Sequence, residues 1–141
     1  MRKVILLVED NDDDVALTHR AFEKHRLANE IVVATDGQQA LDFLFGEEPL
    51  GPTVVLLDLN LPKLSGLDVL RRIRGDKRTE LLPVVVLTSS DHDRDVIESY
   101  RLGANSFVRK PVDFLEFVEA ARQLGLYWLM LNEPPKRRSD V

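Results

Sequence analysis

The chain of 141 residues contains no cysteine and a single tryptophan. The absence of cysteine excludes disulfide bonds, thiolate metal ligands and cysteine nucleophiles. No apolar run approaches the roughly 20 residues that a membrane-spanning helix needs. The segment after Met1-Arg2-Lys3 has no small-residue cleavage signal, so we expect neither a secretory peptide nor a membrane partner.

The chain also has fewer basic than acidic residues. The chain has 19 Lys and Arg residues against 24 Asp and Glu residues, which gives a formal net charge of -5. This balance argues against a nucleic-acid partner, because phosphate backbones are bound by basic surfaces. The three histidines, His19, His25 and His92, lack the spacing of metal ligands. We therefore expect one cytoplasmic domain.

The chain does contain five short apolar segments that are typical of buried strands. The segment around which the others are organised is residues 54–57, Val-Val-Leu-Leu, which runs directly into Asp58. Continuous apolar runs of this length suit strands that are covered on both faces of a parallel sheet. The other four are residues 4–8, 31–34, 83–87 and 106–108. Helical patterns lie between and after them, with expected N-caps at Asn11, Asp36, Ser65 and Asp113. This alternation predicts an α/β fold.

Polar side chains follow four of these five strands. Glu9-Asp10, Asp58, Thr88 and Lys110 should meet, because parallel strands place their carboxyl ends at one edge of the sheet. Unpaired acids there would repel, by about 4 kcal/mol at about 4 Å and an effective dielectric near 20. Oxygen-only donors favour a hard cation, Mg²⁺ or Mn²⁺. With a lysine and a hydroxyl beside a carboxylate, this site is equipped for phosphoryl transfer to Asp58.

These motifs resemble the receiver domain of bacterial two-component response regulators. The resemblance covers residues 3 to about 125, and its matching segments are residues 7–11, 56–62, 65–66, 86–88, 103–104 and 110–111. It implies a flavodoxin-like, doubly wound sheet of five parallel strands in the order 2-1-3-4-5, with five helices.

The resemblance also implies roles for the acids. Asp58 accepts a phosphoryl group from a sensor histidine kinase. Asp10, Asp58 and the backbone carbonyl of Asn60 bind Mg²⁺, and Glu9 acts mainly through a bound water.

On the phosphate side, the resemblance implies that Thr88 and Lys110 bind the phosphoryl oxygens. Thr88 and Phe107 form the switch that carries the signal to the surface. The Lys110-Pro111 peptide bond is expected to be cis, which only an X-Pro bond makes inexpensive.

The last helix extends beyond the family pattern. Residues 126–131 are apolar all the way round, so we expect a homodimer built on the last helix and this extension, with Leu126, Tyr127, Trp128 and Leu129 as candidate contacts. The alternative is that the extension is buried within its own domain, against the first helix or the loop after the second helix. The extension, residues 99–105 and the loop 45–52 resemble the stand-alone regulators that are paired with bacterial phytochrome histidine kinases. We expect a receiver domain over residues 1–131 and a tail or arm over residues 132–141.

Two rival functions remain open from the sequence. We expect a signalling phosphoacceptor with no output domain rather than a conventional enzyme, but a pseudo-receiver that only binds partners is an alternative. A haloacid-dehalogenase-like phosphatase is a second alternative. That class needs an acid two residues after its nucleophile and places the motif on the first strand, whereas here Asn60 occupies the position on the third.

Overall fold

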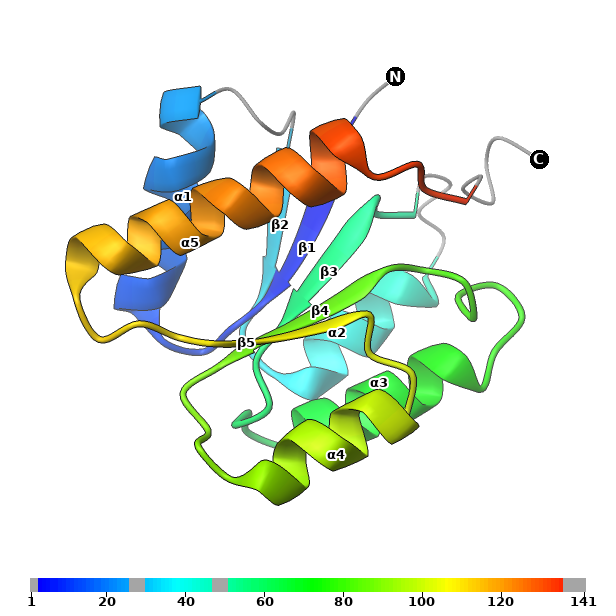
Figure 1. Cartoon of the computed structure of the whole chain (residues 1–141). Coiled ribbons are helices and arrows are strands. Elements are labelled where there is room, and N and C mark those ends of the chain that lie inside the picture. Colours follow the sequence, from blue (N-terminus) through cyan, green and yellow to red (C-terminus); the bar gives the residue numbers. More distant parts are fainter. Residues whose placement is uncertain (1–2, 26–29, 47–50, 136–141) are drawn as a thin grey trace.

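The fold is built on a sheet of five parallel strands, as the sequence predicts. A computed structural model describes residues 3–25, 30–46 and 51–135. The strands are β1 (Val4–Val8), β2 (Glu30–Ala34), β3 (Val54–Leu57), β4 (Val84–Thr88) and β5 (Ser106–Arg109). Every neighbouring pair is parallel, and the order is β2-β1-β3-β4-β5. The predicted order is confirmed, and β3 lies at the centre of the sheet (Figure 1). Asp58 directly follows β3.

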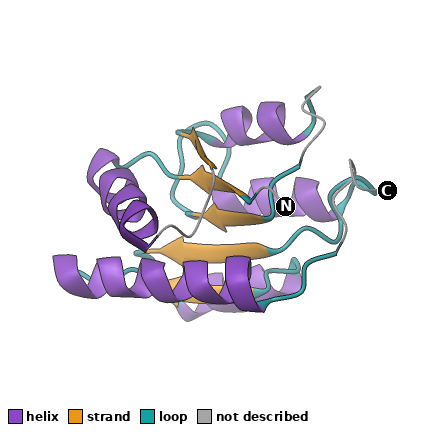
Figure 2. Ribbon diagram, turned by 90° about the horizontal axis from the view of Figure 1, so that it is seen from above, coloured by secondary structure: helices purple, strands orange, loops and turns teal. Residues whose placement is uncertain are grey.

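Helices cover both faces of the sheet (Figure 1 and Figure 2). They are α1 (Asp12–His25), α2 (Gly37–Leu44), α3 (Gly66–Arg74), α4 (Asp93–Arg101) and α5 (Phe114–Gly125). The helices α1 and α5 lie side by side on one face, and α2, α3 and α4 lie on the other (Figure 1). Among the described residues, no helix combines the length and the apolar character needed to cross a membrane.

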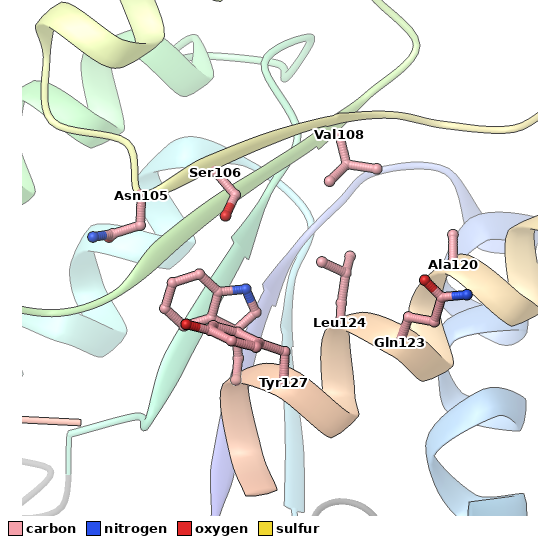
Figure 3. Close-up of a pocket in the computed structure, with 8 residues that line it drawn as sticks. Asn105, Ser106, Val108, Ala120, Gln123, Leu124 and Tyr127 are labelled. Carbon is pink, nitrogen blue, oxygen red and sulfur yellow. The ribbon is translucent and has the colours of Figure 1, made fainter. Parts of the chain in front are cut away.

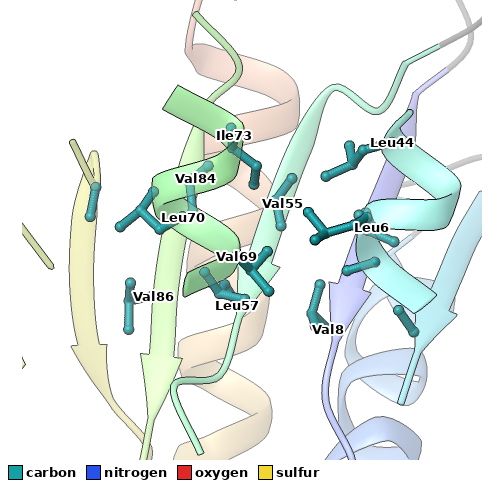
Figure 4. Close-up of a cluster of buried hydrophobic side chains, with 14 of the residues drawn as sticks. Leu6, Val8, Leu44, Val55, Leu57, Val69, Leu70, Ile73, Val84 and Val86 are labelled. Carbon is teal, nitrogen blue, oxygen red and sulfur yellow. The ribbon is translucent and has the colours of Figure 1, made fainter. Parts of the chain in front are cut away.

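Alternate residues of each central strand fill two separate cores. Leu6, Val55, Val84 and their same-face neighbours pack against α2 and α3 (Figure 4). Ile5, Val54, Leu56 and Val85 point to the opposite face, where they meet α1 and α5. Because side chains alternate between the two faces of a strand, a sheet covered twice needs an apolar residue at every position.

The predicted helix caps are confirmed by hydrogen bonds. A side-chain oxygen accepts from the backbone N–H three residues later at Asn11 (3.0 Å), Asp36 (2.8 Å), Ser65 (3.2 Å) and Asp113 (3.0 Å). Each of these bonds satisfies one backbone donor of the first helical turn. The caps therefore fix where each of these helices leaves the edge of the sheet that carries Asp58.

The helical extension at the C-terminal end changes its winding. After Gly125 the chain continues as a π-helical segment, η1 (Leu126–Leu131), rather than as further α-helix. Of the tail or arm predicted over residues 132–141, residues 136–141 lie outside the described residues.

Candidate functional site

Both carboxylate oxygens of Asp58 are bound by side chains from the neighbouring strand ends. Thr88, the last residue of β4, donates its hydroxyl to Oδ1 of Asp58 at 2.7 Å. Lys110, which follows β5, donates its Nζ to Oδ2 at 2.9 Å. The backbone N–H of Asn60 also donates to Oδ1, at 3.1 Å. Asp58 is only 5% exposed, so an anion is held here by directed donors rather than by bulk water.

The backbone around Asp58 is fixed by the turn into α3. The Asp58 N–H donates to the carbonyl of Val8 at 3.0 Å, and the Gly66 N–H donates to the carbonyl of Leu59 at 2.9 Å. A Cβ at position 66 would overlap the Asp58 carbonyl and the Leu59 Cα. Only glycine allows the start of α3 to lie this close to the strand end, which explains the Ser65-Gly66 pair in the motif.

Three acids form a cluster that suits a divalent cation. One carboxylate oxygen from each of Glu9, Asp10 and Asp58 lies within 4.8 Å of the others. Glu9 and Asp58 are buried, and Asp10 is exposed. Three carboxylates with no nitrogen or sulfur ligand match the oxygen preference of Mg²⁺ and Mn²⁺. The residues therefore fit the expected metal, and the carbonyl of Asn60 stays a predicted fourth ligand.

Lys110 is surrounded by three carboxylates. Its Nζ lies 2.5 Å from Glu9 Oε1, 2.8 Å from Asp14 Oδ2 and 2.9 Å from Asp58 Oδ2. Asp14 is not among the site residues that the sequence predicts, so this contact was missed. Helical side chains lean toward the N-terminus of their helix, and Asp14 stands in the first turn of α1. Asp13 shares this first turn and this lean but is exposed, so which acid reaches Lys110 depends on how α1 is oriented over the sheet, and the sequence carries no signal for that orientation.

The charges of the site follow from these contacts. Burial raises the pKa of Glu9 to about 7, and the nearby charge of Asp58 adds to this effect against the hydrogen bond from Lys110. Burial also works to raise the pKa of Asp58, but the hydrogen bonds from Lys110 and Thr88 outweigh it and hold that pKa below its usual value. Burial works to lower the pKa of Lys110, but hydrogen bonds to Asp14, Glu9 and Asp58 raise it. At neutral pH, Asp58 is an anion beside a cation.

The two remaining predicted residues on the β5 side have different outcomes. Phe107 is partly buried against the core beneath α3, and its ring lines a shallow groove with Val96 and Ile97 of α4. The expectation of a cis Lys110-Pro111 bond is wrong, since none of the described peptide bonds is cis. A trans X-Pro bond is favoured by about 0.5–1 kcal/mol, and Lys110 reaches all three carboxylates with the bond in that form.

The candidate dimer residues are divided between the core and the surface. Leu129 is buried, and Leu126 and Trp128 pack partly buried against the core beside α1 and α5. Tyr127 is half-exposed and meets the Trp128 ring edge-on, with centroids 5.0 Å apart. Tyr127 and Trp128 line a groove between β5 and α5, and Figure 3 shows Tyr127 at one end of it. The extension thus buries part of its apolar surface against its own domain, and the dimer stays a prediction.

The response regulator receiver domain matches residues 5–122 of the chain. The chain belongs to this family. This receiver domain is 41% identical over 135 residues to the probable methanogenesis regulatory protein FilR2 of Methanothrix harundinacea, covering 94% of this chain and 87% of that protein. It is 36% identical over 131 residues to the response regulator Rcp1 of Synechocystis, covering 90% of this chain and 89% of Rcp1.

Solved structures show the same fold. The phosphorylated cyanobacterial phytochrome response regulator RcpA has a TM-score of 0.92 at 34% identity, over 96% of this chain and 100% of that chain. The Mn²⁺-bound form of Rcp1 has a TM-score of 0.89 at 36% identity, over 95% and 99%. The bacteriophytochrome response regulator AtBRR is 49% identical, with a TM-score of 0.72, over 94% and 99%. This receiver domain is therefore similar to regulators of two-component signalling that include phytochrome-associated ones.

Proposed function

We propose that this receiver domain is a stand-alone response regulator in which Asp58 accepts a phosphoryl group from a sensor histidine kinase. The observation that carries the proposal is the pairing of the two Asp58 oxygens with Thr88 and Lys110, beside the carboxylates of Glu9 and Asp10. An isolated surface aspartate would not need a hydroxyl, an ammonium and a cluster of acids at hydrogen-bonding range.

The proposed reaction uses the Asp58 carboxylate as the nucleophile. One oxygen attacks the phosphorus of a phosphohistidine, the new P–O bond forms as the P–N bond breaks, and the imidazole leaves. Lys110 stays protonated and pairs with a phosphoryl oxygen, because its pKa is raised. The Thr88 hydroxyl, which is bound to Asp58 in this structure, donates to another phosphoryl oxygen. These donors stabilise charge that water would otherwise have to solvate.

We propose Mg²⁺ or Mn²⁺ as the cofactor, held by Asp10, Asp58 and the Asn60 carbonyl, with Glu9 acting through a bound water. The support is the cluster of oxygens and the Mn²⁺ in the structure of Rcp1. When bound, the ion would offset the negative charge of the carboxylates and of the incoming phosphoryl group. Without such a charge, the site holds four acids around one lysine.

The proposed signal passes through Thr88 and Phe107. Phosphorylation adds about -1.5 to -2 units of charge, and the hydroxyl of Thr88 follows that charge. Phe107 then repacks against Val96 and Ile97, with which it shares the groove on α4. Inverting a population from 1:99 to 99:1 takes roughly 5.5 kcal/mol, to which the new contacts of a phosphoryl group with Lys110 and Thr88 would contribute.

A phytochrome histidine kinase is the partner that we propose. The support is the similarity to RcpA, Rcp1 and AtBRR together with the motif at residues 99–105. Such a pairing places the domain in the cytoplasm. We also propose a homodimer through the extension, whose exposed apolar side chains are those of Tyr127, Met130 and Leu131.

Incubation with acetyl phosphate and Mg²⁺, followed by intact mass measurement, tests the proposed function. We expect one phosphoryl adduct on the native domain, none after addition of EDTA and none on Asp58→Asn. An adduct that persists in Asp58→Asn contradicts the assignment of Asp58. A native domain that forms no adduct favours a pseudo-receiver. Rapid turnover of many phosphate esters would favour the phosphatase alternative.

A further inference from the structure

The ammonium group of Lys110 has no free N–H donor for an additional ligand. An ammonium carries three N–H donors, and three carboxylates lie within 2.9 Å of this one, from Glu9, Asp14 and Asp58. A phosphoryl group on Asp58 can therefore bind Lys110 only if one of the three existing contacts is released.

Asp14 is the partner that can be released most easily. Its side chain is 21% exposed, against 4% for Glu9 and 6% for Asp58, so water can replace the lysine. Asp14 also lies in the first turn of α1, where the positive end of the helix dipole stabilises a carboxylate that has lost its lysine.

The backbone of Asp14 is held in place while its side chain reaches into the site. Its N–H donates to Asn11 Oδ1 at 3.0 Å, and its carbonyl accepts the Thr18 hydroxyl at 2.8 Å. Only side-chain rotation is needed to break or restore the contact with Lys110. The carboxylate is thus held to Lys110 by its side chain alone, and α1 does not have to move for that contact to break.

We infer that Asp14 is a positioning residue that competes with the phosphoryl group for Lys110 and so slows the phosphorylation of Asp58. The inference rests on the proposed function of Asp58. In the resting state Asp14 holds Lys110, and it adds a negative charge near the place where an anionic phosphodonor must bind. When the phosphoryl oxygens arrive, Lys110 exchanges Asp14 for one of them, and Asp14 turns toward solvent. No bond to Asp14 is made or broken in the transfer itself.

The test compares three variants by the second-order rate constant for phosphorylation with acetyl phosphate and Mg²⁺, followed by intact mass. Asp14→Asn removes the competing charge, and we expect the rate constant to rise about threefold or more. Asp14→Glu keeps the charge and should react at the native rate. Asp13→Asn is the matched control, because it removes one exposed acid from the same helical turn, and it should leave the rate constant unchanged.

Thermal unfolding of each variant checks that the fold is intact. A rate constant for Asp14→Asn equal to or below that of the native domain overturns the inference, and so does an equal rise in Asp13→Asn. Both results leave the proposed function standing as long as the native domain forms its adduct. If the native domain forms none, the proposed function and this inference fail together.

Discussion

The hydroxyl of Thr88 lies 2.7 Å from Oδ1 of Asp58, and Thr88 is fully buried. The hydroxyl oxygen of Thr88 also accepts a longer hydrogen bond, at 3.4 Å, from the backbone N–H of Ser90. The Ser90 side chain in turn donates to Asp95 in the first turn of α4, at 2.5 Å. The hydroxyls of Thr88 and Ser90 therefore connect the proposed acceptor to the start of the helix that lines the Phe107 groove.

Thr88→Val tests the strength of this connection. The variant keeps the shape of the side chain but leaves the Asp58 carboxylate without one of its donors, so we expect a loss of about 1.5–3 kcal/mol in the free energy of unfolding at pH 7. The pKa of Asp58 should rise, because the hydrogen bond from Thr88 lowers it. Urea unfolding and carboxyl NMR titration measure the two effects.

Thr53→Val is the matched control for this prediction. Thr53 is buried as well, but its hydroxyl has no hydrogen-bond partner among the described residues. Replacing an unpaired buried hydroxyl by a methyl group should leave stability unchanged or increase it. Equal losses in the two variants would mean that the bond to Asp58 is not the cause.

The stability of the metal-free domain should depend on Glu9 between pH 4.5 and about pH 7. The pKa of Glu9 is about 7 in the folded domain, against 4.5 for an ordinary glutamate. The folded state therefore binds more protons in this range, and the free energy of unfolding falls as pH rises toward 7, by up to about 3 kcal/mol. Urea unfolding in EDTA at several pH values measures this fall. Glu9→Gln should flatten it, and an unchanged slope in that variant contradicts the prediction.

Gly103→Ala should destabilise the domain through Arg74. Gly103 has a φ of 97°, and a Cβ there would lie 2.8 Å from Arg74 Nε. That Nε donates to the Gly103 carbonyl at 3.0 Å, so the Cβ would displace it. We expect the free energy of unfolding, measured by thermal or urea denaturation, to fall by about 1–3 kcal/mol. Gly51→Ala, where a Cβ meets nothing within 4 Å, should change stability by less than about 0.5 kcal/mol.

Leu131→Asp tests the proposed dimer. Leu131 is 75% exposed at the end of η1, so a charge there costs the single domain little but would be buried in an interface through the extension. We expect the dimer dissociation constant to rise at least about tenfold in analytical ultracentrifugation. Leu81→Asp is the control, because Leu81 is 71% exposed in the loop before β4. A native domain that sediments only as a monomer ends the proposal.

The strands, the caps and the meeting of Asp58, Thr88 and Lys110 could be predicted because each depends on local pattern and strand direction. The position of each strand is marked by its apolar run, and parallel pairing brings the following residues to one edge. The placement of Asp14 was not predictable in this way, because acids in a first helical turn are usually explained by the cap and the dipole alone. The distinction between Asp14 and Asp13 depends on how α1 is oriented over the sheet.

Arg74 illustrates a second limit. A basic residue in the last turn of a helix has a ready explanation in the helix dipole, and the sequence offers no carboxylate partner for it. In the structure its guanidinium is half-buried and donates to the carbonyls of Thr79, Glu80, Leu82 and Gly103 and to the side chain of Asn105. Partners that are backbone carbonyls have no sequence signature. The trans form of the Pro111 bond has none either, since less than about 1 kcal/mol separates the two forms.

The two halves of the sheet on either side of β3 should differ in how well they tolerate substitutions. On one side of β3, strands β4 and β5 lead to Thr88 and Lys110, which donate hydrogen bonds to the two carboxylate oxygens of Asp58. The β2 strand stands at the far border, one strand removed from Asp58, and is joined to the centre only through β1. Substitutions on β2 should therefore affect phosphoryl transfer less than substitutions on β5, except at Ala34, whose carbonyl accepts the backbone N–H of Glu9 at 2.9 Å.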